Sequence, residues 1–183
     1  GSPYRNTYEG NNGTVEYLAK FNSDLTQLTA ATYLGQDSSS FIGNLTIDAS
    51  NNVWIVGYTA ADNLATSTGA YQPVHHNPLV DYDGYIMKWD SSLTTPLYGT
   101  YLGGTGSNDL LYNISLDNSG NVFVFGTSNS TNFPVTAGAY QTSYGGGAAD
   151  LIIARLSSDL TTLQASTYVG TGTGESQISQ AAK

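Results

Sequence analysis

A repeated segment constrains this chain more than any other feature of its sequence. Three stretches align, each with the pattern S-x-L-T followed by T-Y-x-G, and they are Ala19–Gly35, Met87–Gly103 and Ala154–Gly170. A second block occurs twice in the same order, at Asn44–Gly57 and Asn113–Gly126. Blocks that recur in a fixed order at a spacing of 67–69 residues indicate a solenoid, a propeller or an array.

Each repeat unit has the residue pattern of four β-strands. Apolar residues alternate with polar ones in the first segment and form a short continuous run in the second, and no segment sustains the 3.6-residue period of a helix. In one unit the segments are Asn44–Ala49, Val53–Val56, Tyr85–Trp89 and Leu97–Leu102. Asn51 and Gly120 share a column between the first two segments, and both tolerate the positive φ of a tight hairpin. Such a hairpin makes the strands antiparallel and disfavours a parallel solenoid.

The predicted fold is therefore all-β, built from β-propeller blades that are four-stranded antiparallel meanders. About two and a half blades are expected, which makes an incomplete propeller. The predicted divisions are the last two strands of a first blade (1–35), a complete blade (36–103), another complete blade (104–170) and the truncated start of a further repeat (171–183). Because propellers typically have four to eight blades, we expect the end faces to be covered by remaining blades of a longer chain or by other protein chains.

Repeated residues at a fixed period are expected to serve repeated packing. We therefore predict equivalent environments in successive blades for two columns of the alignment. They are Leu25, Leu93 and Leu160, and Tyr33, Tyr101 and Tyr168.

Composition excludes several classes of partner and scaffold. Five basic residues stand against 14 acidic ones, and the net charge of −9 disfavours nucleic acid as a partner. The chain has no cysteine, which excludes a disulfide scaffold and thiolate metal sites. No apolar run approaches the 20 or so residues of a membrane span, so no such span is predicted.

The clearest copy of the second block resembles a known repeat family. Leu116–Gly126 reads L-D-N-S-G-N-V-F-V-F-G, and Asn132–Gln141 reads N-F-P-V-T-A-G-A-Y-Q. Together with S-x-T-Y-L-G-G, these motifs resemble the SBBP repeats of bacterial β-propeller proteins. In the first long loop Asn63–Ser67 departs from the pattern, because the Phe-Pro pair is missing. The resemblance implies a secreted or surface-attached bacterial protein and carries no catalytic residues with it.

Tyrosines in the long loops are the candidate ligand-binding residues. Tyr71 and Tyr140 recur in register, which favours a role in pinning each loop to its blade. Tyr82 and Tyr144 lie in the same loops without that strict register, and contact with a ligand is as plausible for them as pinning. Exposed aromatic rings in loops stack on sugars or bind proteins.

Acidic residues near the loop ends supply a weaker candidate, a cation site. Asp81 and Asp83 resemble the start of a calcium loop, but the full ligand pattern is absent. Asp83 aligns with Asp150, which equally suits a repeated structural task at the start of a strand. His75 and His76 lie nearby, but adjacent residues in an extended chain point to opposite sides, so one metal ion cannot easily bind both. No cofactor is expected.

The sequence thus predicts a non-catalytic, extracellular or cell-surface binding or display module, with a glycan or a surface protein as its possible ligand. The first alternative is a structural spacer or an assembly subunit that joins other chains through open blade faces. A carbohydrate-active or metal-dependent enzyme is the third. Long loops on a rigid scaffold favour the first of these functions.

Overall fold

A computed structural model describes residues 16–34 and 40–172, and the regular elements within them are all β-strands. In chain order these are β1 (Tyr17–Phe21), β2 (Leu28–Tyr33), β3 (Ser40–Ile47), β4 (Val53–Thr59), β5 (Asp83–Trp89), β6 (Pro96–Leu102), β7 (Asp109–Leu116), β8 (Val122–Ser128), β9 (Asp150–Leu156) and β10 (Leu163–Val169). Strands β1 and β2 form the hairpin sheet, β3 to β6 the middle sheet and β7 to β10 the last sheet.

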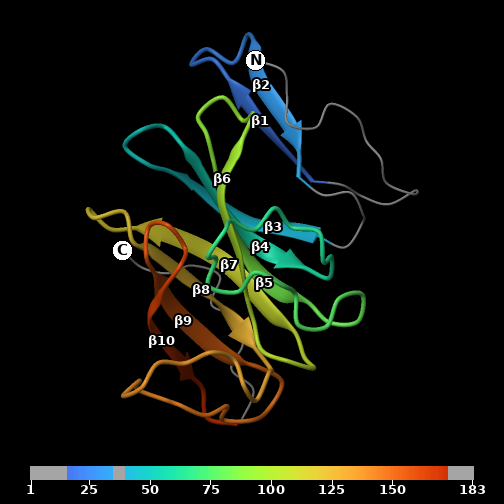
Figure 1. Cartoon of the computed structure of the whole chain (residues 1–183), viewed down its shortest axis with the longest axis vertical. Coiled ribbons are helices and arrows are strands. Elements are labelled where there is room, and N and C mark those ends of the chain that lie inside the picture. Colours follow the sequence, from blue (N-terminus) through green and yellow to red (C-terminus); the bar gives the residue numbers. More distant parts are fainter. Residues whose placement is uncertain (1–15, 35–39, 173–183) are drawn as a thin grey trace.

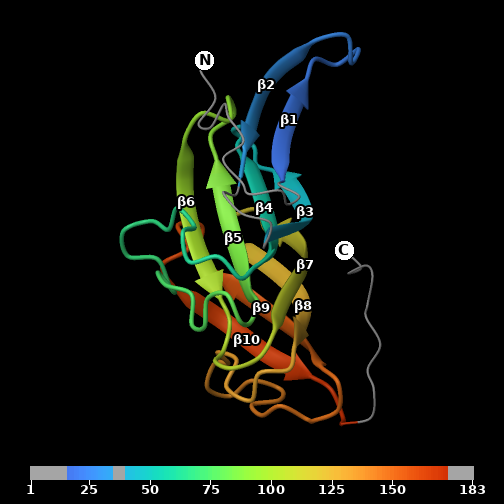
Figure 2. The same ribbon diagram turned by 90° about the vertical axis from the view of Figure 1, so that its right-hand side faces the viewer.

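Every pairing is antiparallel between consecutive strands, so the middle and last sheets are simple four-stranded meanders. The three sheets follow one another along the molecule in chain order (Figure 1). The first strands of the two full sheets, β3 and β7, lie side by side (Figure 2). The prediction of an all-β fold made of four-stranded meanders is confirmed. Positions 1–15, 35–39 and 173–183, with most of the predicted further repeat, lie outside the described residues.

The β3–β4 and β7–β8 hairpins owe their tight turns to an aspartate at the end of the first strand. Asp48 Oδ1 accepts the N–H groups of Ser50 and Asn52, each at 2.9 Å, and Asn51 adopts a φ of 62°. Asp117 repeats these bonds in the last sheet, where Gly120 has a φ of 78°. A turn with positive φ matches the twist of the strands that it joins.

The apolar residues of the middle sheet are buried on both of its faces, which explains the continuous apolar run of β4. Trp54 and Val56 pack against the last sheet in one core. Ile55 and Met87 face the hairpin sheet and pack with Leu18 in another. Each core therefore lies between two successive sheets, as between the blades of a propeller.

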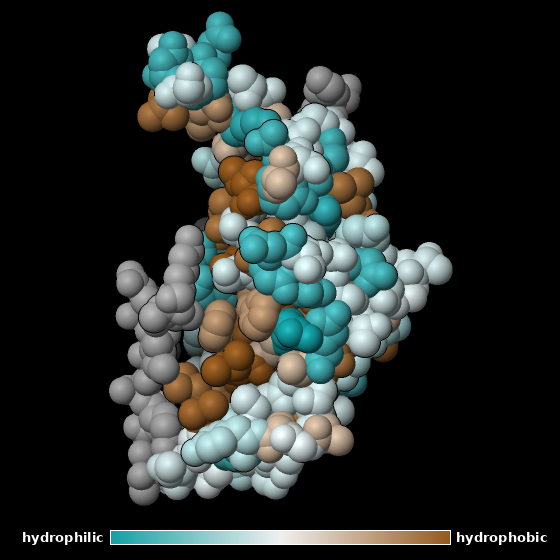
Figure 3. All heavy atoms as spheres, turned by 90° about the vertical axis from the view of Figure 1, so that its left-hand side faces the viewer, coloured by the Kyte–Doolittle hydropathy of each residue, from teal (hydrophilic) through white to brown (hydrophobic). Residues whose placement is uncertain are grey.

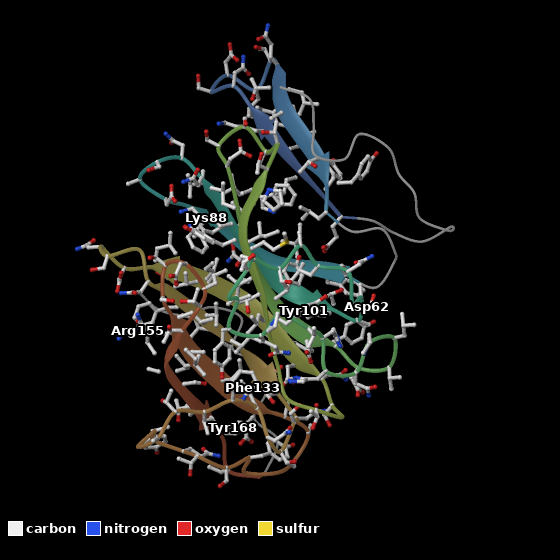
Figure 4. The ribbon with its side chains drawn as sticks, viewed as in Figure 1. Asp62, Lys88, Tyr101, Phe133, Arg155 and Tyr168 are labelled. Carbon is white, nitrogen blue, oxygen red and sulfur yellow. The ribbon has the colours of Figure 1, made fainter. Side chains whose placement is uncertain are left out.

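Repeated residues fasten the long loop that joins the second and third strands of each full sheet. The Tyr101 hydroxyl donates to the carbonyl of Ala61 at 2.9 Å and accepts the N–H of Leu64 at 3.1 Å. Tyr168 in the last sheet does the same with Ser130 and Phe133. Figure 4 shows Phe133 beside Tyr168, and their rings lie 6.0 Å apart.

The glutamine of the G-A-Y-Q motif fastens the other end of the same loop. Gln72 Nε2 donates to Asp83 Oδ2 at 2.8 Å, and Gln72 Oε1 accepts the N–H of Gly103 at 2.9 Å. Gln141 bonds in the same way to Asp150 and Gly170. The motif thus ties the loop to the start of the third strand and to the end of the fourth.

Replacing Tyr101 with phenylalanine should lower the free energy of unfolding by about 2 kcal/mol, because two loop hydrogen bonds lose a partner that is fully buried. Chemical denaturation measures the change. Tyr140→Phe is the matched control, since Tyr140 is exposed and its variant should unfold like the wild type. Equal stability of the two variants would show that the hydroxyl of Tyr101 does not hold the loop.

The prediction of equivalent environments is wrong for the leucine column. Leu25, Leu93 and Leu160 share the left-handed turn conformation, with φ values of 59°, 56° and 60°. However, Leu25 is 75% exposed, whereas Leu93 and Leu160 are buried. The buried pair pack toward the preceding sheet, and among the described residues no sheet precedes the hairpin sheet. In the tyrosine column, Tyr101 and Tyr168 are buried and Tyr33 is half-buried.

Candidate functional site

Four aromatic rings gather where the middle and last sheets meet. Phe41 stacks on Tyr58 with ring centroids 5.0 Å apart, and Tyr82 packs edge-on against both, at 6.0 Å and 5.4 Å. Tyr112 of the last sheet lies 6.3 Å from Tyr58. We call Phe41, Tyr58, Tyr82 and Tyr112 the aromatic cluster. Phe41 is 41% exposed and the tyrosines are half-buried, so the cluster presents ring surface to solvent.

The strand register and a backbone clamp place these rings together. Phe41 and Tyr58 are direct cross-strand partners in the β3–β4 ladder. The N–H of Tyr82 donates to Asn108 Oδ1 at 3.0 Å, and its carbonyl accepts the N–H of Asp109 at 2.7 Å. Tyr82, in the loop before β5, is thus held against the segment that leads into β7.

Polar groups lie beside the rings. Tyr112 occupies a bulge in β7, and its hydroxyl lies 3.2 Å from the Thr127 hydroxyl. Asn44 Nδ2 donates to Asn113 Oδ1 at 3.1 Å, which joins the first strands of the two sheets. Burial raises the pKa of the Tyr58 phenol, and the neighbouring Tyr112 and Tyr82 add to the rise, so this phenol is a neutral donor near pH 7. Ring faces with amides and neutral hydroxyls nearby suit an uncharged polar ligand such as a sugar.

The other three predicted tyrosines do not join the aromatic cluster. Tyr71 is half-buried between the full sheets, and its N–H donates to the Leu160 carbonyl at 2.8 Å. Tyr144 donates its hydroxyl to Gly147 at 2.7 Å, and its ring packs 6.2 Å from that of Tyr168, so both residues pin their loops. Tyr140 is 87% exposed, which rules out pinning for this residue within the described structure.

Tyr140 instead borders a groove of about 410 Å³ on the far side of the last sheet. Phe123, Ile153 and Arg155 line its floor, and the loop residues Thr136–Tyr140 form one wall. The groove therefore covers the face of β8 and β9 that turns away from the middle sheet.

The predicted cation ligands serve the loops. Asp83 Oδ2 accepts Gln72 Nε2 and the N–H of His76, and Asp150 Oδ2 accepts Gln141 Nε2 and the N–H of Gly145. These two aspartates begin the third strands of different sheets. Asp81 accepts Asn77 Nδ2 within its own loop. Among residues 16–34 and 40–172, no group of three or more His, Cys, Asp or Glu side chains is arranged to hold a metal ion.

The two histidines are also engaged by groups of the loop and its neighbouring strand. His75 is buried, with Nε2 2.8 Å from the carbonyl of Thr59 and Nδ1 accepting the N–H of Asn77 at 3.0 Å. Both ring nitrogens are thus occupied, and a metal would have to displace a backbone bond. His76 Nδ1 lies 3.1 Å from Gln72 Nε2.

A pair of buried carboxyls, Asp83 and Asp109, lies between the two full sheets. A Cβ placed on Gly103 would be 2.5 Å from Asp83 Oδ1 and 3.0 Å from Asp109 Oδ2, so the carboxyls approach one another at this glycine. Burial raises the pKa of Asp109 to about 6, and the charge of Asp83 adds to the rise. Burial also raises the pKa of Asp83. The sequence singled out Asp83 but gave no sign that Asp109 would meet it.

Sequence reasoning found one ring of the aromatic cluster, Tyr82, and missed the other three. Phe41, Tyr58 and Tyr112 lie at strand positions from two repeats, and no motif joins them. Their register offered a signal, because Phe41 and Tyr58 lie opposite one another in a hairpin.

The fold defines a protein built from antiparallel four-stranded blades that pack face to face. Residues 97–134, which run from β6 through β8 to the Phe133-Pro134 pair, match the model of the SBBP family, a β-propeller repeat. The resemblance predicted from the motifs is confirmed over this stretch. No curated protein matches the chain. Within the described residues, no helix is long and apolar enough to cross a membrane.

Proposed function

We propose that this chain is a non-catalytic β-propeller segment of a secreted or surface-attached bacterial protein, and that it binds a glycan through the aromatic cluster. The supporting observation is the partly exposed group of Phe41, Tyr58, Tyr82 and Tyr112, held by hydrogen bonds between two rigid sheets. Because the rings are fixed before a ligand arrives, little conformational entropy is lost on binding.

The charge of the chain narrows the ligand class. With a net charge of −9, the surface repels nucleic acids and acidic polysaccharides. Neutral oligosaccharides remain, and their C–H faces stack on tyrosine while their hydroxyls bond to amides such as Asn44. A surface protein with an exposed apolar or aromatic patch is the other ligand that this site suits.

A spacer or assembly role is the second candidate, and the exposed apolar ends of the stack favour it. Tyr17, Phe21 and Leu25 on the hairpin sheet are 62%, 49% and 75% exposed. A carbohydrate-active or metal-dependent enzyme ranks third. Its observable signature would be turnover of an oligosaccharide that chelation or His75→Ala abolishes.

The test is a binding screen of the whole chain against neutral oligosaccharides immobilised on an array. Tyr82→Ala should weaken binding to any retained sugar by roughly 10- to 100-fold, since loss of a stacked ring removes about 1.4–2.8 kcal/mol. Tyr82→Phe keeps the ring and should bind nearly as well as the wild type.

Tyr140→Ala is the matched control, because Tyr140 is an exposed loop tyrosine outside the aromatic cluster. It should bind like the wild type. If no oligosaccharide is retained, or if Tyr140→Ala loses binding while Tyr82→Ala keeps it, the proposed site is wrong.

A further inference from the structure

The repeat aligns four apolar columns on the side of each sheet that faces the preceding sheet. In the middle sheet these residues are Tyr85, Met87, Trp89 and Leu93, and in the last sheet they are Ile152, Ala154, Leu156 and Leu160, all at most 3% exposed. In the hairpin sheet the same columns hold Tyr17, Ala19, Phe21 and Leu25, each of which is exposed. The hairpin sheet therefore has the same apolar side that the middle and last sheets pack against the sheet before them. Among the described residues, this side of the hairpin sheet has no sheet to pack against.

The opposite end of the stack carries the complementary surface. Trp54, Val56 and Ile86 lie on the side of the middle sheet that the last sheet covers. Their counterparts in the last sheet are Phe123, Phe125 and Ile153, and Ile153 is 38% exposed. Figure 3 shows hydrophobic residues gathered in the lower half of this view, where the last sheet lies. We call this side of the last sheet the open face.

A backbone hydrogen bond marks how two successive full sheets meet. The N–H of Tyr71 donates to the carbonyl of Leu160 at 2.8 Å. The counterpart of Tyr71 on the open face is Tyr140, and the counterpart of Leu160 on the hairpin sheet is Leu25. Both are highly exposed, and the turn at Leu25 has nearly the same φ as that at Leu160, 59° against 60°. Leu25 thus lies in a turn of the same conformation as the one that Tyr71 contacts.

A second bond marks the contact between the hairpin and middle sheets. Lys20 Nζ donates to the carbonyl of Ser91 at 2.9 Å. In the repeat, Lys20 aligns with Lys88 and Arg155, and Ser91 aligns with Ser23. Figure 4 shows Lys88 and Arg155 on the same side of successive sheets. Arg155 Nε is buried and has no hydrogen-bond partner among the described residues, so the bond that Lys20 makes has no counterpart at Nε of Arg155 there.

We propose that copies of this chain associate head to tail, with the hairpin sheet of one copy seated on the open face of the next. The two surfaces lie at opposite ends of the molecule (Figure 1), so they must meet between copies. A contact between two different surfaces of the same chain builds rings or open filaments rather than an isologous dimer. The contact would pair Tyr140 with Leu25 and Arg155 with Ser23. This inference does not depend on the proposed glycan site.

Sedimentation velocity over a range of protein concentrations tests the association. The wild type should form dimers and larger species, and added salt should strengthen association because it screens the repulsion between copies of charge −9. Leu25→Asp and Tyr140→Asp each place a charge in the contact. Each should raise the dissociation constant at least about 100-fold, which is the effect expected when a residue at the centre of an interface is changed.

Leu79→Asp is the matched control, because Leu79 is also an exposed leucine with positive φ (79% exposed, 67°) but lies outside both surfaces. It should associate like the wild type. All three positions are exposed, so the variants should fold, and circular dichroism checks this.

A mixing experiment tests the head-to-tail geometry. Leu25→Asp keeps an intact open face and Tyr140→Asp keeps an intact hairpin sheet, so an equimolar mixture should form dimers that grow no further. A wild type that stays monomeric at every concentration would overturn the proposal. Other molecules or segments, such as further repeats, would then be the partners of the two faces. The proposal would also be overturned by association that both variants leave unchanged, or by a mixture that stays monomeric while the wild type associates.

Discussion

Replacing Gly126 with alanine should lower the free energy of unfolding by at least about 4 kcal/mol, or prevent folding altogether. A bulge in β7 brings the carbonyl of Leu110 against Gly126, and a Cβ added there would overlap that oxygen and lie 3.0 Å from Leu111 Cα. These are backbone atoms of a paired strand, which cannot move aside without breaking the ladder. The glycine of V-x-V-x-G therefore marks a close approach of two strands.

Gly138→Ala is the control for this prediction. Gly138 has a φ of 77°, and no atom lies within 4 Å of an added Cβ, so alanine there costs only about 1 kcal/mol of backbone strain. Urea denaturation of the two variants gives the comparison. Gly57 has the same bulge contact with Phe41 in the middle sheet, and Gly57→Ala should behave like Gly126→Ala. If Gly126→Ala matched Gly138→Ala, the register of the β7–β8 ladder would be wrong.

Asp109 should make the protein less stable as the pH rises. Its pKa is raised from 3.8 in the unfolded chain to about 6 in the fold, mainly by burial. Between these values the folded state binds more protons than the unfolded state, so the free energy of unfolding falls with rising pH. The loss begins near pH 4, is complete above about pH 6 and amounts to about 3 kcal/mol from this group.

Asp109→Asn isolates this contribution. The amide oxygen can still accept the N–H of Gly104 and the hydroxyl of Ser130, which bond to Asp109 Oδ2 at 2.7 Å and 2.8 Å. The amide N–H takes the place of Oδ1, which is buried and has no hydrogen-bond partner among the described residues, so no existing bond is lost there. As the pH rises from about 4 to about 8, the free energy of unfolding of the variant should increase by about 3 kcal/mol relative to that of the wild type.

Thermal or urea unfolding at several pH values checks this prediction, with Asp159→Asn as the control. Asp159 accepts hydrogen bonds in an exposed turn, chiefly from Ser157, and its pKa is lowered. Its variant should therefore lose stability relative to the wild type as the pH rises, which is the opposite sign. Parallel pH profiles for Asp109→Asn and the wild type would show that the fold does not raise the pKa of Asp109.

The repeat predicted the four-stranded sheets because several of its residues have a local task. Asp48 and Asn51 shape one hairpin turn, Tyr101 fastens the following loop, and Gln72 ties that loop to two strands. Such tasks depend on neighbours within one blade, so spacing along the chain is enough to reveal them. The lack of a 3.6-residue apolar period likewise predicted strands rather than helices, and the regular elements of the described residues are all strands.

Properties that depend on the neighbouring blade were not predictable in this way. Leu25 matches Leu93 in sequence and turn conformation, but among the described residues only Leu93 has a preceding sheet to pack against. The approach of Asp109 to Asp83 also crosses two blades, and no periodic pattern reports it. The aromatic cluster is the same kind of feature, since Tyr112 reaches it from the last sheet.

The position of the ligand site is tested most directly by NMR of the wild-type chain with labelled tyrosine rings. Neutral oligosaccharides retained on the array are titrated into the protein, and ring shifts are followed for each tyrosine. We expect Tyr58, Tyr82 and Tyr112 to shift together in a saturable way, while the buried Tyr101 and Tyr168 stay unchanged. Shifts confined to Tyr140 and the open face, or no saturable shift at the aromatic cluster, would contradict a glycan site between the two full sheets.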